Sequence, residues 1–432
     1  MDQGARKLGP GLAMMLVAGN MIGSGIYLLP ATLGAIGSVS VVGWVIAAVG
    51  AVLLAAVFSA LSVLRPTTEG AVAYAGEGLG RFFGFQAGWL YWISCWVGDV
   101  AIAVAVTGYL AVFVPALEAP WAAAGATIAV IWLLTLANLA GARLVGVLQG
   151  ATLALGLIPV LAAGVFGWLW FHPDVFANSW NVSGRPAAQA VHASLVSVFW
   201  AFLGLESAAM AAAAVRDPAR NVPIATAGGV ALAALVYILA TTALMGVLPA
   251  SELARSSAPF ATVMERIGGA AAAALITACA LLKASGTLGG WILVTAQTSR
   301  WTAAAGFLPR WLARERADGT PAHALIAMAA LMTVVTCLTV APTLGEQFGV
   351  LINVAVVLSL LVYAACCAAL LRFSGEIADS RTRMLARAAA VLALVFCAWV
   401  VTGSGAATLV VSCGVVAAAT LVWLPLRRRA RA

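Results

Sequence analysis

Long apolar segments follow one another along the whole chain, separated by short stretches that contain polar residues, Pro or Gly. An apolar segment of roughly 20 residues is long enough to cross the hydrocarbon core of a bilayer as an α-helix. We therefore predict an all-α membrane protein with twelve transmembrane helices. The spans lie near residues 11–33, 41–62, 84–115, 121–140, 149–171, 188–213, 223–247, 268–297, 322–341, 349–371, 388–403 and 406–425.

The composition supports this interpretation, because 63% of the residues are apolar and only 9% are charged. Soluble domains are about 45–50% apolar and about 25% charged. The seven cysteines lie inside apolar segments without the spacing of metal ligands, so we expect no disulfide, metal or cofactor. The N-terminal segment lacks a small-residue cleavage site, so we expect the first apolar segment to remain as a span.

Basic residues indicate the orientation of the chain in the membrane. Of the 23 Lys and Arg residues, nineteen fall on one side of the predicted topology, three fall on the other, and Lys283 lies within a span. Lys and Arg accumulate in cytoplasmic loops. We therefore predict a multi-pass protein of the cell (inner) membrane with both termini in the cytoplasm. The net charge of +8 follows from this topology and from contact with membrane lipid, without a nucleic-acid partner.

The first predicted span contains several residues that weaken a helix. Gly19, Gly23 and Gly25 lie within seven residues of each other and Pro30 follows, and each interior Gly costs roughly 1 kcal/mol of helix propensity. This pattern predicts an interruption near the middle of the bilayer, which is tolerated only beside protein or a water-filled cavity. The alternative is close packing of a continuous helix through Gly19 and Gly23.

The sixth predicted span contains Gly204 and then Glu206, an acid at membrane depth. A charged side chain at a helix centre costs about 2.5–3.5 kcal/mol, so it is expected to have a function. Interrupted helices at matching positions of two halves are typical of inverted-repeat transporters. We therefore predict one half over residues 1–172, a second of opposite orientation over 173–372, and two further helices with a basic tail over 373–432.

Two interrupted helices can together bind an α-amino acid without charged side chains. The N-terminus of a half-helix carries unpaired N–H groups and the positive end of the helix dipole, which attract a carboxylate. The carbonyl groups released at the other interruption attract an ammonium group. The pattern therefore predicts a site for a small-molecule amino acid or amine between the first and sixth spans.

Five segments carry a resemblance to a known family, namely GNMIGSGIYLLP (19–30), LYWISCWVGD (90–99), WAFLGLES (200–207), RNVPIAT (220–226) and GTLGGWILVTAQ (286–297). They resemble the arginine:agmatine antiporters of the amino acid, polyamine and organocation (APC) superfamily, over essentially the whole chain. Lysine/cadaverine and ornithine/putrescine antiporters look related through the same segments, so the substrate stays open. The resemblance implies a five-plus-five inverted repeat with two further helices, often a homodimer, that exchanges an amino acid for its decarboxylation product.

The resemblance also implies the residues of the site. The substrate-binding set is Asn20, Ile22, Gly23, Ser24, Gly25, Ser94, Cys95, Asp99, Trp200, Leu203, Gly204 and Trp291, and the gate set is Tyr91, Trp200, Phe202, Glu206, Trp291 and Tyr363. In this scheme Ser24 and Gly25 receive the carboxylate, and the carbonyls near Leu203 and Gly204 receive the α-amine. Trp200 forms the outer gate and Trp291 stacks on the substrate. Tyr91, Glu206 and Tyr363 close the inner side.

Two charged residues depart from the arginine-binding pattern, which looks to have Asn in place of Asp99 and a small residue in place of Lys283. Asp99 follows Tyr91 by eight residues and Lys283 precedes Trp291 by eight, which is about 12 Å along each helix axis. We therefore expect the two charges to lie at similar depth and to pair. The alternative is a Lys283 side chain that reaches the outer interface.

Charge counting gives a prediction about the substrate. Asp99, Glu206 and Lys283 leave a net charge of −1, which favours a monocationic amino acid, or a neutral one with a proton on Glu206. The alternative is strict exchange of a cationic amino acid for its diamine. Because Lys283 lies close to the hydroxyls of Ser285 and Thr287, we expect proton coupling or pure exchange rather than sodium coupling.

Two other functional classes fit the sequence less well. An intramembrane enzyme needs a nucleophile with a base, or metal ligands, at membrane depth, whereas only His192 of the three histidines is expected to be internal. A channel needs polar groups along a continuous path, but here they gather at one depth. We therefore expect a transporter and not an enzyme or a channel.

Overall fold

A computed structural model describes residues 9–23, 25–66, 68, 70–141, 155–206 and 215–429. Within this part, eight helices are long and apolar enough to cross a membrane. They contain α3 (Ser40–Leu64), α5 (Arg81–Ala111), α6 (Pro120–Ala140), α11 (Pro218–Val247), α13 (Pro259–Ala304), α15 (Leu344–Phe373), α16 (Ser380–Gly403) and α17 (Ala406–Arg429). Each of the eight coincides with one of the predicted spans.

The other four predicted spans contain shorter apolar helices. The first contains α1 (Pro10–Met21) and α2 (Gly25–Gly34), and the ninth contains α14 (Ala322–Leu338). The fifth contains the helical segment Leu155–Trp170, whose last turn is η2 (Gly167–Trp170), and the sixth contains α9 (Ala187–Phe199) followed by η3 (Trp200–Phe202). The all-α class is thus observed in the described residues.

Several short helices lie between the predicted spans. They are α4 (Ala71–Leu79), η1 (Pro115–Glu118), α8 (Pro173–Asn178), α12 (Ala250–Arg255), η5 (Arg310–Ala313) and η6 (Ser374–Glu376). The helix α13 begins before its predicted span, because residues 259–268 are also helical. Gly269, with a φ of 76°, separates them from the rest of α13 by a break in the regular helix. A positive φ of this kind is easily adopted only by Gly.

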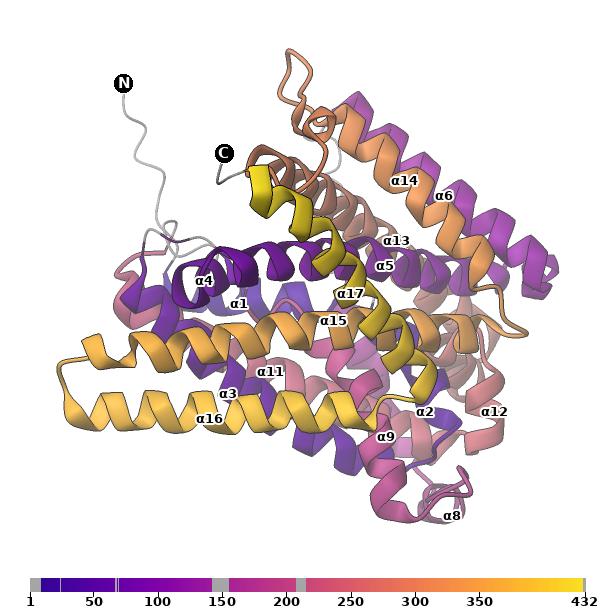
Figure 1. Cartoon of the computed structure of the whole chain (residues 1–432). Helices are drawn as coiled ribbons and strands as arrows, with labels where there is room; N and C mark the ends of the chain where they lie inside the picture. The colour runs from indigo at the N-terminus through magenta and orange to yellow at the C-terminus, as the bar shows by residue number, and fades with distance from the viewer. Residues whose placement is uncertain are drawn as a thin grey trace.

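The helices are packed in layers around α5 and α15 (Figure 1). The helix α5 contacts α15, α13 and α4, while α16 packs along the outer side of α15 and α6 pairs with α14 at one flank. Leu133 of α6 and Leu338 of α14 are 67% and 78% exposed. Apolar exposure on this scale marks a surface that meets lipid or another apolar partner, as expected of helices in a bilayer.

The predicted interruption of the first span is confirmed. The helix α1 ends at Met21, Ile22 leaves the helical region with a ψ of 63°, and α2 begins at Gly25. A continuous helix packed through Gly19 and Gly23 is therefore wrong. Pro30 lies inside α2 and not at the interruption, because the preceding glycines already let the backbone leave the helix.

The predicted interruption of the sixth span is confirmed for the N-terminal part of the span, up to Glu206. The helix α9 gives way to the single turn η3 at Trp200, Leu203 is extended with a ψ of 139°, and Gly204 has a φ of 96°. Residues 207–214 lie outside the described residues, so the second half-helix of this span stays a prediction. The two interruptions bring non-helical backbone into the interior beside α5, α13 and α15.

Candidate functional site

A cavity of about 70 Å³ lies between the two interruptions. The residues that line it are Met21, Gly23, Tyr91, Ser94, Cys95, Gly98, Asp99, Ile102, Trp200, Leu203, Gly204, Glu206, Thr287, Trp291, Ser359 and Tyr363. They come from both interrupted spans and from α5, α13 and α15. Eleven of the sixteen belong to the sets that sequence analysis predicted.

Glu206 lines the cavity together with two tyrosines that contact it. The Tyr363 hydroxyl on α15 donates a hydrogen bond to Glu206 Oε2 at 2.7 Å, and the Tyr91 hydroxyl on α5 donates to Oε1 at 3.3 Å. Glu206 and Tyr363 are 3% and 1% exposed. Three segments that are far apart in the sequence are therefore joined at a single carboxylate.

Further packing lies beyond Glu206. The helix α4 runs along the end of α15, where the Cys366 thiol donates to the Ala71 carbonyl oxygen at 3.3 Å. Gly78 of α4 sits against Ala369 so closely that an added Cβ would collide with its side chain. The helix α4 is therefore packed closely against the turns of α15 that follow Tyr363.

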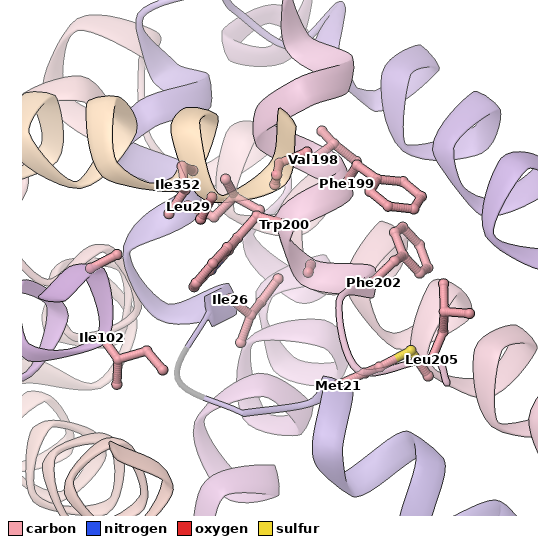
Figure 2. Close-up of a cluster of buried hydrophobic side chains, with 14 of the residues drawn as sticks. Met21, Ile26, Leu29, Ile102, Val198, Phe199, Trp200, Phe202, Leu205 and Ile352 are labelled. Atoms are coloured by element: carbon pink, nitrogen blue, oxygen red, sulfur yellow. The ribbon is translucent and has the colours of Figure 1, made fainter. Parts of the chain in front are cut away.

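Trp200 covers another part of the cavity. Its ring faces Gly98 of α5, where a Cβ would lie only 3.0 Å from Trp200 Cη2, and it makes an edge contact with Phe348 at 6.3 Å between centroids. Figure 2 shows the indole of Trp200 beside Ile26 of α2. The ring lies on the side of Ile26 that faces Ile102. The indole N–H is buried and has no hydrogen-bond partner in the described part of the chain.

Asp99 projects from α5 toward α13. Thr295 Oγ1 donates a hydrogen bond to Asp99 Oδ2 at 2.8 Å, and Asp99 is 1% exposed. Trp92, two helical turns before Asp99 on α5, donates from Nε1 to Oγ of Ser299, one turn after Thr295 on α13, at 2.7 Å. These two contacts define the antiparallel register of α5 and α13.

This register contradicts the expected pairing of Asp99 with Lys283. Lys283 precedes Thr295 by twelve residues on α13, which is about 18 Å along the helix axis. No ion pair joins Asp99 to Lys283, although both residues are described. The expectation failed because it placed Tyr91 and Trp291 at one depth, whereas Trp291 lies one turn before Thr295, close to the level of Ile102.

Lys283 does not line the cavity. It is 2% exposed, and its methylene stem packs over Gly156, at which an added Cβ would collide with Cγ, Cδ and Cε of the lysine. The carbonyl oxygen of Gly156 accepts a hydrogen bond from the Tyr27 hydroxyl of α2 at 2.7 Å. Lys283 therefore belongs to the packing between α13, α2 and the fifth span.

Some predicted site residues are placed elsewhere or lie outside the description. Ile22 is 3% exposed and belongs to the apolar core. Phe202 is fully buried among aromatic rings, 6.0 Å from Trp44 and 5.8 Å from Tyr237 between centroids. Ser24 lies outside the described residues, and only the backbone of Asn20 and Gly25 is described.

Five lining residues were not predicted, and helix periodicity could have found four of them. Ile102 is three residues after Asp99, Thr287 is four before Trp291, and Ser359 is four before Tyr363. Residues three or four apart share one face of a helix. Gly98 similarly follows Cys95 by three residues, while Met21 was missed because the end of α1 could not be placed to one residue.

Among the described residues, the ionisable side chains that could carry charge in this cavity are acids. Asp99 and Glu206 line it, and no described Lys, Arg or His does. In the described residues, no group of three or more His, Cys, Asp and Glu could hold a metal ion. Two buried carboxylates in one cavity favour a cationic ligand, because an unpaired buried charge is expensive.

Comparisons with known proteins agree in pointing to transport. Residues 11–425 match the sequence model described as amino acid permease. The chain is 39% identical over 376 residues to a cadaverine/lysine antiporter of Escherichia coli strain K12, covering 86% of this chain and 84% of the relative. It is 34% identical over 366 residues to the putrescine transporter PotE of the same strain, covering 85% and 83%. The PotE of Haemophilus influenzae is 34% identical over 370 residues, covering 86% and 85%.

Proposed function

Because the chain belongs to the amino acid permease family, we propose that it is an antiporter that exchanges basic amino acids for diamines across a cell membrane by alternating access. Lysine or ornithine would exchange against cadaverine or putrescine. The named relatives are a cadaverine/lysine antiporter and a putrescine transporter. Their membrane transport activity, together with the apolar helices found here, supports a multi-pass transporter rather than an enzyme.

The observation that carries this proposal is the charge of the cavity. Asp99 and Glu206 line it, and no basic side chain does within the part of the chain that the structure describes. A dication such as a diamine balances both carboxylates, and a basic amino acid brings one net positive charge of its own. The sequence-based preference for neutral or monocationic substrates counted Lys283 as part of the site. Because Lys283 packs on Gly156 outside the cavity, that preference loses its basis.

The interrupted helices provide the means of binding the amino acid end of a substrate. We propose that the start of α2, near Gly25, receives a carboxylate through its N–H groups and helix dipole. The backbone near Leu203 and Gly204, where the chain is extended and turned, supplies carbonyl groups for the α-ammonium. A diamine lacks the carboxylate and uses ammonium contacts only.

Two gates alternate in this scheme. Trp200 opens and closes one side by swinging its ring away from Gly98 and Phe348. Tyr91 and Tyr363 hold Glu206 and close the other side, as their hydrogen bonds in this conformation support. Breaking those two bonds and moving α4 away from α15 would open the inner side.

We extend the proposal to the topology of the chain. It comprises twelve spans, a five-plus-five inverted repeat with the boundaries 1–172 and 173–372, and both termini in the cytoplasm. The four shorter apolar helices at the predicted positions support the count of twelve. A homodimer is also proposed, by resemblance to the family.

Exchange in proteoliposomes tests the function. Purified protein is reconstituted into vesicles loaded with cadaverine, and uptake of radiolabelled lysine is measured. We expect rapid uptake into loaded vesicles and little into empty ones, with putrescine as a second internal substrate. Equal uptake into loaded and empty vesicles would contradict exchange, and uptake of neutral amino acids in preference to lysine would contradict the substrate class.

A further inference from the structure

The helix α6 carries a buried amide that joins it to α13. Asn138 is fully buried, and its Nδ2 donates to two carbonyl oxygens, that of Leu134 within α6 and that of Gly289 on α13, each at 3.0 Å. Because both neighbouring groups are acceptors, only the NH2 end of the amide can serve them. An amide buried among apolar helices is costly unless it is hydrogen-bonded, so these two bonds fix the position of the side chain.

The accepting carbonyl on α13 lies in a segment rich in glycine. Gly286, Gly289 and Gly290 fall within five residues of this helix. Each interior Gly costs roughly 1 kcal/mol of helix propensity relative to Ala, and small residues also let a neighbouring helix approach closely. The hydrogen bond from Asn138 therefore restrains α13 at a turn that its own residues restrain weakly.

The same turn of α13 supplies two residues to the wall of the cavity. Thr287 precedes Gly289 by two residues and Trp291 follows it by two, and both line the cavity. Thr287 is 5% exposed, and its hydroxyl has no hydrogen-bond partner in the described residues. The place of these side chains in the wall thus depends on what holds the backbone of α13 between them.

A second polar contact joins α6 to another helix of the cavity wall. The hydroxyls of Thr127 on α6 and Thr107 on α5 share a hydrogen bond of 2.9 Å. Thr127 precedes Asn138 by eleven residues, which is about 16 Å along α6, and both lie on its buried face. The helix α6 is therefore hydrogen-bonded to the two helices that carry Asp99 and Trp291, although none of its described residues lines the cavity.

We propose that Asn138 is a positioning residue, whose bond to the Gly289 carbonyl keeps Thr287 and Trp291 in place for the substrate. This inference rests on the proposed exchange of basic amino acids and diamines and deepens it by naming a residue that acts on the site from outside the cavity. A binding group must be held within about 0.5 Å of its productive place by the residues behind it. An indole also attracts a cation only when its face is turned toward that cation.

Ligand binding to detergent-solubilised full-length protein tests this role by a double-mutant cycle. Binding of lysine and of cadaverine is measured by titration calorimetry for the wild type, Asn138→Leu, Trp291→Ala and the double variant. We expect Asn138→Leu to weaken binding of both ligands about tenfold when Trp291 is present. When Trp291 is already Ala, the further loss should be less than about threefold, because the amide acts through that residue.

Asn138→Leu is expected to fold. Leu has nearly the shape of Asn without its polar atoms, and a carbonyl inside a helix also accepts from the backbone N–H four residues further on. The Gly289 carbonyl is therefore not left without a donor.

Gln347→Met is the matched control, because it removes another buried amide that joins two helices. Gln347 of α15 is 3% exposed, and its Nε2 donates to the Thr336 carbonyl oxygen of α14 at 3.3 Å and to Thr339 Oγ1 at 3.2 Å. It does not line the cavity. Gln347→Met should lower the unfolding temperature at least as much as Asn138→Leu but leave both affinities unchanged.

Two substitutions keep the test readable. If Asn138→Leu does not fold, Asn138→Ala replaces it and should weaken binding in the same way. If Trp291→Ala binds too weakly to measure, Thr287→Val takes its place in the cycle. Losses that multiply in the double variant would overturn the assignment, as would wild-type affinity in a folded Asn138→Leu protein or an equal loss in Gln347→Met. Binding by the wild type without exchange in loaded vesicles would instead contradict the proposed function.

Discussion

At the scale of single residues, the most connected group in the cavity is Glu206. It is held by hydroxyls from two other helices, and it follows Gly204, where the backbone leaves the helix, by two residues. A carboxylate that accepts two hydrogen bonds is held firmly in one place, yet each bond can be broken separately. These properties suit a gate that must close tightly and open repeatedly.

Replacing Tyr363 by Phe removes the shorter of the two bonds to Glu206, at 2.7 Å. Hydrogen bonds to charged groups contribute about 1.5–3 kcal/mol, so we expect a lower unfolding temperature and an exchange rate reduced about tenfold or more. The measurements are thermal unfolding in detergent and lysine/cadaverine exchange in vesicles.

The matched control is Tyr237→Phe. Tyr237 is also fully buried, but its hydroxyl has no partner in the described residues, so its removal should leave exchange unchanged. If the two variants behave alike, the bond from Tyr363 to Glu206 has no particular role.

At the scale of elements, α5 forms the central wall of the site. It carries Tyr91, Asp99 and Ile102 on one face and contacts α13 and α15 through long stretches of its length. Gly98 lies on this face and leaves room for the Trp200 ring. The helix therefore determines both which groups line the cavity and how closely the ring of Trp200, the proposed gate, approaches it.

Gly98→Ala should interfere with the position of Trp200. The added Cβ would lie 3.0 Å from Cη2 and 3.3 Å from Cζ3 of the ring, so the indole must shift by a few tenths of an ångström. We expect weaker substrate binding, while stability changes by no more than about 1–3 kcal/mol. Binding by calorimetry and thermal unfolding are measured together.

Gly88→Ala, on the same helix, is the control for this substitution. Its Cβ would meet only ordinary contacts, at 3.6 Å from Thr302 Cγ2 and from Val72 Cγ1, and Ala favours the helix over Gly. Binding should be unchanged and stability equal or higher. Weakened binding in both variants to the same degree would show that any added methyl on α5 is disruptive.

The start of α16 provides a pH-dependent test outside the spans. Asp379 caps this helix by accepting hydrogen bonds from Thr382 N at 2.8 Å and Thr382 Oγ1 at 2.6 Å. The bonds from Thr382 hold the pKa of Asp379 below its usual value of 3.8. Because the folded pKa is depressed, the cap stabilises the protein above the usual value, and this stabilisation is lost as the pH falls through the folded pKa.

Asp379→Ala should therefore lower the unfolding temperature near pH 7 and have progressively less effect below about pH 4. The check is thermal unfolding of wild type and variant over a pH series. A difference that grows as the solution is made more acidic would contradict the assigned cap.

At the scale of the whole molecule, the arrangement places two backbone interruptions against the three long helices α5, α13 and α15. The cavity exists because segments from both parts of the sequence, near residues 21–23 and 200–206, approach the same faces of α5, α13 and α15. Regular helices alone would have filled this space with side chains. Transport by alternating access requires that the same site face each side of the membrane in turn.

The orientation of the whole chain can be tested with single cysteines. Cys337 and Cys413 are the exposed native cysteines among the described residues, so both are first replaced by serine. A cysteine at Arg185, between α8 and α9, should react in intact cells with a thiol reagent that does not cross membranes. A cysteine at Arg383 should react only after the cells are opened. The reverse pattern would place the termini outside.

Much of this architecture could be predicted from the sequence because its causes are local. The apolar segments were long enough to require helices in a bilayer, and Gly23 and Gly204 marked where those helices end. The resemblance implied that Glu206, Tyr91 and Tyr363 lie together. Both tyrosine hydroxyls do donate hydrogen bonds to Glu206. The short helices between the spans were not predicted, because segments of three to nine residues are too short to show a clear helical period.

What the sequence by itself determined was therefore the class of the protein, the places where helices are interrupted and the presence of two acids at membrane depth, since these depend on the residues of one segment at a time. Only the tertiary structure decided that Asp99 meets Thr295 and that Lys283 packs on Gly156. The axial offset between α5 and α13 depends on side-chain packing between distant segments. An axial offset of a few helical turns moves a charged side chain by more than 10 Å. That distance is enough to place Lys283 outside the cavity, which Asp99 and Glu206 line.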